Sequence, residues 1–284
     1  MQYRADSLGL VGHVTTLLMD LIHEQLGLHY TPADADQVGD RLAPLVVARG
    51  LASFMDYYYV LKYTPGPDDW LKVMDALAVQ ETYLWREIDQ LRAVVDHLVP
   101  ALVTAHRGGP LRIWSSACAS GEEPLTVAML LDEAGWFDRA PIEIVASDAS
   151  PVAIARARKG DYTQRSFRNL PPSLKEKYFV PRDGHWTVIP DLHRRVSYDL
   201  VNLVAEDQVA RYASASVILC RSSVITDAVM AMIGIPRVTG SARSLRSASI
   251  PSIPGSRMSI RTRLGCRSWA RRTPSSPVSA SMIA

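Results

Sequence analysis

The chain has 284 residues, of which 48% are hydrophobic and 21% charged, a composition that excludes a charge-rich disordered protein. This length is enough for one large domain or two modest ones, each with its own hydrophobic core. The formal net charge of +2 combines two unlike parts. Residues 1–221 carry 22 Lys and Arg against 28 Asp and Glu, a net charge of −6, whereas residues 222–284 carry 9 against 1, a net charge of +8. An acidic first part argues against a nucleic-acid-binding protein.

Cysteine and histidine usage points away from disulfides and metals. The three cysteines, Cys118, Cys220 and Cys266, are too few and too irregularly spaced for a disulfide framework or a zinc site, which favours a reducing, cytoplasmic location. The seven histidines are scattered without metal-ligand spacing. No apolar run approaches the roughly 18 residues of a membrane span, and the N-terminus lacks a cleavage signature. We therefore expect a soluble protein without membrane insertion or bound metal.

The first hundred residues have the periodicity of helices. Apolar residues at helical spacing from Val14 to Ile22 predict an amphipathic helix that stops near Gly27. Similar patterns predict helices around residues 42–48, 53–63, 70–78 and 84–98, the last ending at Pro100. We expect an all-helical domain over residues 1–105.

The period changes after a Gly-Gly-Pro break at residues 108–110. Residues 111–115 and 142–147 read as buried strands, each followed by a helix, which is the opening of a doubly wound α/β sheet. Short strand-like pieces in residues 160–200 suggest a small β insertion, and residues 216–220 return to the sheet. The second domain is expected to span residues 106–221.

Residues 222–284 have a different texture. They contain 14 serines and 9 arginines, no Lys, Glu, Tyr or Phe, and no sustained helical or strand period. Two interpretations are open: a disordered tail that binds a polyanion, or residues translated out of frame. The second is favoured because no strands remain to complete the sheet, which we expect to be incomplete at its C-terminal side.

Acidic residues follow two neighbouring strands of the predicted sheet. Glu122 and Glu123 open the helix after the first strand, where they suit a cationic group or simply complement the helix dipole. Asp148 ends the second strand, where a carboxylate can accept the ribose hydroxyls of a nucleoside or cap a turn. Two glutamates would repel a pyrophosphate, so the combination favours S-adenosyl-L-methionine as the cofactor.

These residues belong to motifs that resemble one family, the CheR-type methyltransferases, which methylate glutamate side chains of chemoreceptors. The resemblance covers residues 11–221. Its motifs are Gln80-Glu-Thr-Tyr-Leu-Trp-Arg-Glu87, the loop from Trp114 to Pro124, Ala146-Ser-Asp148, Val201-Asn-Leu203, and Cys220-Arg221. Leu170, Lys177-Tyr-Phe179, Trp186 and Val196 resemble the family's small antiparallel subdomain. The resemblance implies a Rossmann-like methyltransferase domain after an all-helical one.

The resemblance also implies roles for single residues. Glu123 would meet the amino group of the cofactor, with Glu122 a less suitable substitute, and Asp148 would hold the ribose. The remaining cofactor residues would be Gln80, Thr82 and Arg86 from the helical side, Asn202 and Leu203 at the adenine, and Arg221 with Ser222 as the last wall. Gln80 and Ser222 stand where the family has Asn, and Ala117 replaces the first glycine of the loop.

The implied reaction is attack of a glutamate carboxylate on the sulfonium methyl group, which needs alignment and desolvation but no general base. Arg86 is the expected catalytic residue, since a bidentate cation can position the substrate or cofactor carboxylate. Its alternative role is a salt bridge to Glu87 or Asp89. The expected partner is the cytoplasmic domain of a chemoreceptor, whose C-terminal peptide can dock on the β insertion. The alternative function is a non-catalytic S-adenosylmethionine-binding or interaction module.

Overall fold

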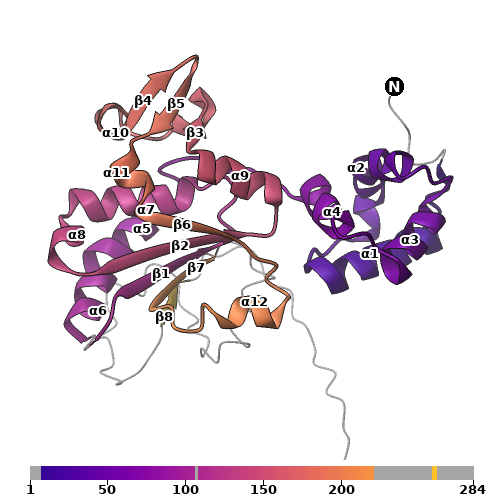
Figure 1. The fold of residues 1–284 in the computed structure, drawn as a ribbon, viewed down its shortest axis with the longest axis horizontal. Coiled ribbons are helices and arrows are strands. Elements are labelled where there is room, and N and C mark those ends of the chain that lie inside the picture. Colours follow the sequence, from indigo (N-terminus) through magenta and orange to yellow (C-terminus); the bar gives the residue numbers. More distant parts are fainter. Residues whose placement is uncertain (1–7, 106–107, 221–257, 261–284) are drawn as a thin grey trace, which may run out of the picture.

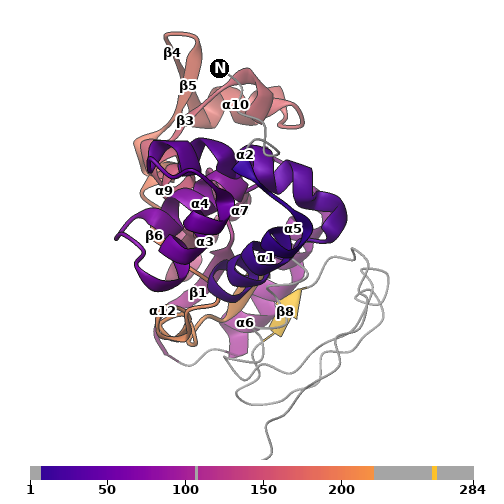
Figure 2. The same ribbon diagram turned by 90° about the vertical axis from the view of Figure 1, so that its right-hand side faces the viewer.

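The computed structural model describes residues 8–105, 108–220 and 258–260. A group of helices at the N-terminus is followed by a parallel sheet flanked by helices, and a small second sheet stands at one end of it (Figure 1). Turned by 90°, the N-terminal helices lie in front of the main sheet (Figure 2). Among the described residues, no helix has both the length and the apolar character needed to cross a membrane.

Four helices share one hydrophobic core at the N-terminus. They are α1 (Gly12–Leu26), α2 (Ala35–Ala48), α3 (Phe54–Tyr63) and α4 (Asp69–Leu77), with a short 3-10 turn η2 (Pro32–Asp34) before α2. Leu18, Ile22, Leu42 and Phe54 are completely buried in this core. Helix α2 begins seven residues before the predicted residue 42, because Thr31 and Asp34 form a capping box that starts the chain turning early.

The next helices belong to the core of the sheet. They are α5 (Ile88–Ala93), the π-helical turn η3 (Val94–Leu98) and α6 (Val99–Ala105). A single helix from residue 84 to Pro100 is therefore wrong at both ends. Trp85 and Glu87 have φ values of 67° and 51°, which no regular helix allows, so α5 starts only at Ile88. At the other end, the helical stretch does not stop at Pro100, because α6 follows the π-helical turn directly and continues to Ala105.

This packing also moves the boundary between the two domains. Leu84, Leu91 and Val95 are buried with the sheet residues, whereas Leu77 is buried with the N-terminal helices. The sequence predicted the boundary at residue 105, where the periodicity changes from that of a helix to that of a strand. The side chains place it near residue 80, because helical residues after that point bury their apolar face against the sheet rather than against α1 to α4.

The main sheet has five parallel strands in the order β6-β2-β1-β7-β8. They are β1 (Leu111–Ser116), β2 (Ile142–Asp148), β6 (Val196–Leu200), β7 (Val217–Cys220) and β8 (Met258–Ile260). From β1 the chain proceeds through β2 to β6 on one side, and then returns to place β7 on the other side of β1. A reversal of this kind leaves a crevice at the carboxyl ends of the strands, which is where ligands of open α/β sheets bind.

Two segments on opposite faces cover this sheet. Helix α7 (Glu122–Glu133) packs on one face together with α5 and η3 (Figure 1). On the other face, α12 (Glu206–Ala210) leads to Tyr212, whose ring stacks on Trp114 of β1 at 4.5 Å between centroids. Helices α8 (Trp136–Arg139) and α9 (Pro151–Lys159) flank β2 along the chain. The predicted α/β architecture is confirmed.

The predicted insertion is a three-stranded antiparallel sheet in the order β3-β5-β4. Its elements are β3 (Asp161–Tyr162), η4 (Gln164–Phe167), α10 (Pro172–Tyr178), β4 (Phe179–Arg182), β5 (His185–Val188) and the following α11 (Pro190–His193). The rings of Phe167, Phe179 and Trp186 pack edge to face between them. Val196–Leu200, assigned to the insertion from sequence, is instead strand β6 of the main sheet, because its backbone pairs with β2.

The described residues after Arg221 are Met258–Ile260, and they belong to the main sheet. Met258–Ile260 forms β8, parallel to β7, so the expectation that no further strand would follow is wrong for these three residues. The rest of the predicted Ser/Arg-rich tail lies outside the described residues.

Candidate active site

The loop that joins β1 to α7 requires unusual backbone conformations. Ala117 and Ala119 have φ values of 58° and 49°, and Gly121 has 91°. A Cβ atom on Gly121 would lie 3.1 Å from both the Ala157 Cβ and the Tyr198 Cε1, so glycine is needed there for space as well as for conformation. The left-handed conformation of Ala117 gives a physical reason why a glycine suits this position better. The loop brings the start of α7 close to the carboxyl ends of the strands.

Two buried glutamates open α7, and each is held by serine hydroxyl groups. Glu122 is 3% exposed and accepts hydrogen bonds from Ser120 Oγ (2.7 Å) and Ser166 Oγ (3.1 Å). Glu123 is 5% exposed and accepts one from Ser115 Oγ at 2.7 Å. Burial raises the pKa of Glu122. Carboxylates buried in this way are costly unless a cation or several donors compensate them, so they suit a positively charged ligand group.

Asp148 lies at the end of β2 and connects the two loops above the sheet. Its Oδ2 accepts a hydrogen bond from the Ala119 N–H (2.8 Å), and its Oδ1 accepts one from the Ser150 N–H (2.9 Å). Burial is the main cause that raises the pKa of Asp148, although the hydrogen bonds oppose it. The carboxylate is therefore fixed in orientation by backbone groups, as a residue that receives ribose hydroxyls must be.

The segment Gln80–Glu87 crosses from α4 to α5 and is fastened to both loops. Gln80 Nε2 donates to Ser150 Oγ at 2.8 Å, two residues from Asp148. Farther along, the Trp85 N–H donates to Thr126 Oγ1 at 3.1 Å, in the first turns of α7. Thr82 lies between these two attachments and is partly buried. The structure thus brings the predicted residues Gln80, Thr82 and Arg86 to the same edge of the sheet as Asp148.

Arg86 follows the attachment at Trp85 and has a partly exposed side chain. Its Nη1 donates to the Glu81 carbonyl oxygen at 2.7 Å, and its guanidinium lies 5.5 Å from the centre of the Tyr83 ring. The alternative salt bridge to Glu87 is also present, with 3.9 Å between Arg86 Nε and Glu87 Oε1. Both side chains are about one third exposed, and a pair of this kind contributes under about 1 kcal/mol, so the ion pair does not by itself explain why an arginine is present.

Asn202 and Leu203 follow β6 and lie directly after a residue that is bonded to Asp148. The Val201 N–H donates to the Asp148 carbonyl oxygen at 2.9 Å, which keeps this segment beside the site. The Asn202 Nδ2 donates to the Gln25 carbonyl oxygen of α1 at 2.8 Å, and so links the two domains. Leu203 is buried against Trp114 in the small core under α12. Arg221 and Ser222, the other two predicted cofactor residues, lie outside the described residues.

Two buried hydroxyl groups were missed by sequence reasoning. Ser116 Oγ and Tyr198 OH are buried and have no hydrogen-bond partner among the described residues. Ser116 is the last residue of β1, so its position between the strand and the loop was a usable signal. Tyr198 lies in β6 and is brought to Gly121 only by the fold. Cys118 is buried, which raises the pKa of its thiol and agrees with a packing role rather than a nucleophile.

The residues present fit S-adenosylmethionine. The buried carboxylate of Glu123 matches its ammonium group, and the partly buried carboxylate of Asp148 matches its ribose hydroxyls. The hydroxyl of Ser116 offers an unused polar group at the end of β1. The first glutamate, Glu122, is turned toward Ser166 of the insertion. Within the described residues, no group of three or more His, Cys, Asp or Glu could hold a metal ion.

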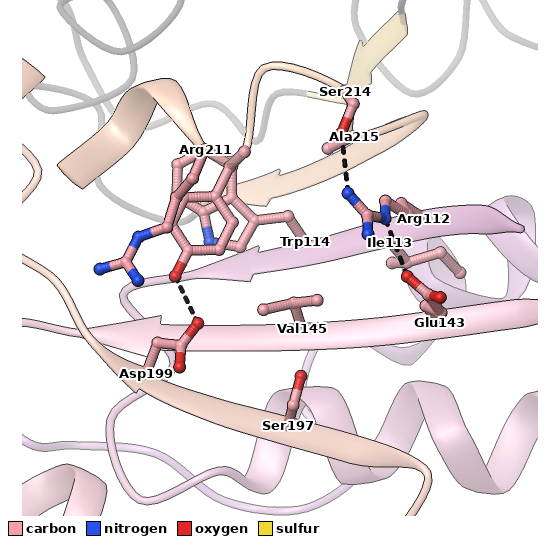
Figure 3. Close-up of a pocket in the computed structure, with 11 residues that line it drawn as sticks. Arg112, Ile113, Trp114, Glu143, Val145, Ser197, Asp199, Arg211, Ser214 and Ala215 are labelled. Atoms are coloured by element: carbon pink, nitrogen blue, oxygen red, sulfur yellow. Dashed lines mark hydrogen bonds and ion pairs between the residues drawn. The ribbon is translucent and has the colours of Figure 1, made fainter. Parts of the chain in front are cut away.

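A separate hollow lies on the α12 face of the sheet (Figure 3). There Arg112 bridges Glu143 (2.8 Å) and Ser214 (3.0 Å), and Tyr212 OH donates to Asp199 Oδ2 at 2.6 Å. None of the predicted cofactor residues lines it. The hollow is therefore separate from the candidate active site.

Comparison with known families covers both domains. The family described as "CheR methyltransferase, SAM binding domain" matches residues 80–226, and the one described as "CheR methyltransferase, all-alpha domain" matches residues 16–78. These limits agree with the change of hydrophobic core near residue 80.

The chain is also similar to curated proteins that are named chemotaxis protein methyltransferases. The chain is 32% identical over 209 residues to "Chemotaxis protein methyltransferase 2" of Vibrio cholerae, which covers 72% of each chain. It is 27% identical over 212 residues to "Chemotaxis protein methyltransferase" of Escherichia coli, covering 73% of this chain and 72% of the relative. These matches support a methyltransferase and give no support to a non-catalytic module. The chain belongs to the CheR methyltransferase family, with S-adenosyl-L-methionine as its methyl donor.

Proposed function

We propose that this chain transfers a methyl group to glutamate side chains in the cytoplasmic domain of a chemoreceptor. The observation that carries the proposal is the convergence of Glu123, Asp148 and the Arg86 segment at the carboxyl ends of β1 and β2. One buried acid, one partly buried acid and a cation from the segment before α5 form a site for a ligand that carries both an ammonium and a carboxylate group.

In this proposal, Glu123 binds the amino group of the methionine part and Asp148 binds the ribose. Gln80 and Thr82 close the site from the helical side, and Asn202 and Leu203 border it near the adenine. Hydrogen bonds from Ala119 and Ser150 hold the Asp148 carboxylate before the ligand arrives, which lowers the entropy cost of binding. Arg221 and Ser222 complete the proposed set.

Bound S-adenosylmethionine supplies a methyl group on a positively charged sulfur. A glutamate carboxylate is already ionised at neutral pH, so the protein needs no general base and acts by orienting the two reactants and excluding water. Such alignment can lower a barrier by roughly 7–11 kcal/mol. Arg86 is the proposed catalytic residue, because its guanidinium keeps its charge and can hold a carboxylate through two parallel hydrogen bonds.

Transfer of tritiated methyl groups to a receptor cytoplasmic fragment tests this function. We expect the full chain to label the fragment, and Arg86→Ala to lower the rate by roughly 10² or more while folding normally, since one positioned charge contributes that much. Arg86→Lys keeps the charge but loses the bidentate geometry, and should recover only part of the rate. Unchanged labelling by Arg86→Ala would reject the role of Arg86, and a wild-type chain that labels nothing would reject the function.

We propose a more specific partner as well, the C-terminal peptide of the receptor, which binds at the small sheet. Strand β4 is an edge strand, and edge strands can pair with an extended peptide. Val180 on this strand is 54% exposed, and the Lys175 ammonium lies 3.6 Å from the Trp186 ring centre nearby. Both features offer contacts to a peptide with apolar and acidic side chains.

Binding of a labelled receptor C-terminal peptide tests this site. We expect Val180→Asp to weaken the peptide severalfold, while Leu17→Asp, at another exposed apolar residue in α1, leaves it unchanged. Methylation of a receptor fragment without the peptide should not respond to Val180→Asp. Equal peptide affinity for the two variants would argue against docking on β4.

A further inference from the structure

Three arginines gather around Glu81 and Tyr83 at the edge of the proposed site. Arg168 Nη2 lies 3.2 Å from Glu81 Oε1, and Arg165 Nη2 lies 4.0 Å from the same oxygen. The Arg168 guanidinium lies over the Tyr83 ring at 3.7 Å from its centre. Arg86 lies near the same ring and donates to the Glu81 main chain. We call these five residues the arginine cluster.

The cluster lies where the Gln80–Glu87 segment meets the insertion. Glu81 stands between Gln80 and Thr82, two proposed cofactor contacts. Arg165 belongs to η4 and Arg168 follows it. Between them, the Ser166 carbonyl accepts from the Leu84 N–H at 2.9 Å, and its hydroxyl donates to the buried Glu122. Arg165 and Arg168 are thus one and two residues from Ser166, which contacts the buried Glu122, yet their own side chains reach solvent.

The charges in the cluster are unevenly matched. Both Arg165 and Arg168 face a single carboxylate, Glu81, whose side chain is 58% exposed. The first 221 residues carry a net charge of −6, so a concentration of guanidinium groups at this edge runs against the charge of its surroundings. A local cationic spot beside a reaction centre attracts and orients an anionic substrate.

We propose that Arg168, assisted by Arg165, binds a second acidic side chain of the substrate protein, next to the glutamate that is methylated, and that this side chain displaces Glu81. The inference rests on the proposed function, because it deepens the choice of substrate for the same site. An exposed ion pair is weak, so Glu81 yields readily to a better placed carboxylate. The ring of Tyr83 keeps the Arg168 guanidinium in position during the exchange, because stacking restricts its rotation.

Fluorescence anisotropy with two labelled peptides tests the proposal on the full chain without any turnover. One peptide contains pairs of glutamates, and the other has glutamine in their place. We expect the wild type to prefer the glutamate peptide, and Arg168→Ala to weaken that peptide about tenfold, the value of one charge-assisted contact. Arg168→Lys should retain part of the affinity. Glu81→Gln should strengthen binding about threefold, since it removes the internal competitor while keeping the size of the side chain.

A second exposed pair supplies the matched control. Arg112 and Glu143 are 2.8 Å apart and exposed to a similar degree, but they lie in the hollow on the other face of the sheet. Arg112→Ala and Glu143→Gln should leave both peptides unaffected. The proposal is overturned if the wild type does not distinguish the peptides, or if Arg168→Ala behaves like Arg112→Ala.

Methyl transfer separates this inference from the function on which it rests. In an active wild type, Arg168→Ala should raise KM for a receptor fragment about tenfold, with the affinity for S-adenosylmethionine unchanged. An unchanged KM with normal wild-type activity overturns only the role of Arg168. A wild type that transfers no methyl group rejects the proposed function instead, and the peptide titration still decides whether the cluster binds acidic side chains.

Discussion

The helical domain and the sheet domain bury very different side chains. Among the described residues of the helical domain, the buried polar ones are Thr15 and Asp69. The sheet domain buries Ser115, Ser116, Glu122, Glu123, Thr126, Ser147, Ser150 and Ser166, and all of them lie at the carboxyl ends of its strands or on the elements that pack there. Buried polar groups are costly, so their concentration at one edge indicates that the edge serves a ligand rather than stability.

The buried acids of the two domains illustrate the difference. Asp69 is paired with a cation of its own domain, Arg49, and also accepts a hydrogen bond from the Gly66 N–H at 2.8 Å. Glu123, the proposed contact of the cofactor ammonium, accepts a hydrogen bond from the Ser115 hydroxyl, a neutral donor that compensates a negative charge less than a cation does. An acid with a structural role is paired with a cation of the same chain. An acid that binds a cationic ligand is fully compensated only when the ligand is bound.

Glu123→Gln should have the largest effect on function. Removing the charge that meets the cofactor ammonium should weaken S-adenosylmethionine by about 10²-fold, because an ion pair with a buried partner is lost. Calorimetric titration measures the affinity, and thermal unfolding without ligand should show little loss of stability. Retained affinity would remove Glu123 from the site.

Asp69→Asn should lower stability and leave cofactor affinity unchanged, the opposite of what is expected for Glu123→Gln. The exchange leaves Arg49 without its counter-charge and should lower the free energy of unfolding by about 1–2 kcal/mol, a reduced value because Arg49 is 41% exposed. Chemical denaturation measures this loss. Cofactor affinity should be unchanged, so a parallel loss of affinity would contradict the separation between the two domains.

Glu122→Gln should show a pH-dependent gain in stability. Burial raises the pKa of Glu122 above its ordinary value of 4.5, so the native chain holds this proton more tightly than the unfolded one. The native state therefore loses stability as the pH rises through the raised pKa. The melting temperature of the variant should exceed that of the wild type at pH 7, and the difference should shrink as the pH falls toward 4.5.

Glu133→Gln is a control for which the expected change in stability with pH has the opposite sign. Hydrogen bonds from Lys177 and Tyr178 lower the pKa of Glu133, so its contribution to stability is present above 4.5 and is lost as the pH falls through the lowered pKa. Glu133→Gln should thus melt below the wild type at neutral pH and approach it in acid. Parallel pH profiles for the two variants would contradict the assignment of burial as the cause at Glu122.

Ala117→Gly should have the smallest effect. The left-handed conformation costs alanine roughly 1–2 kcal/mol, and glycine avoids this cost. Glycine loses more conformational entropy on folding, which costs about 0.5–1 kcal/mol, so a net stabilisation of about 0.5 kcal/mol is expected. Ala155→Gly, in the exposed interior of α9, should instead destabilise by about 1 kcal/mol. A melting temperature that falls in both variants would show that the φ of Ala117 is not strained.

Much of the fold and the site could be predicted from local patterns. The order of helices, strands and insertion follows from apolar periodicity. The acids Glu123 and Asp148 were recognisable because one opens the helix after a predicted strand and the other ends the next strand. The start of α5 could not be predicted, because Leu84 and Trp85 are bonded to Ser166 and Thr126, which are remote in sequence, and positive φ values at Trp85 and Glu87 accompany these contacts. The hydrogen bond from Asn202 to Gln25 could not be predicted either, because the two residues are remote in sequence.

The sequence by itself determined the family, the cofactor and the alternation of strand and helix, because motif spacing and side-chain period are local properties of the chain. Only the tertiary structure decided that residues 84–105 belong to the core of the sheet, that Val196–Leu200 is its edge strand, and that Arg165 and Arg168 meet Glu81. These features depend on which surfaces pack together, and packing joins residues that no local pattern connects.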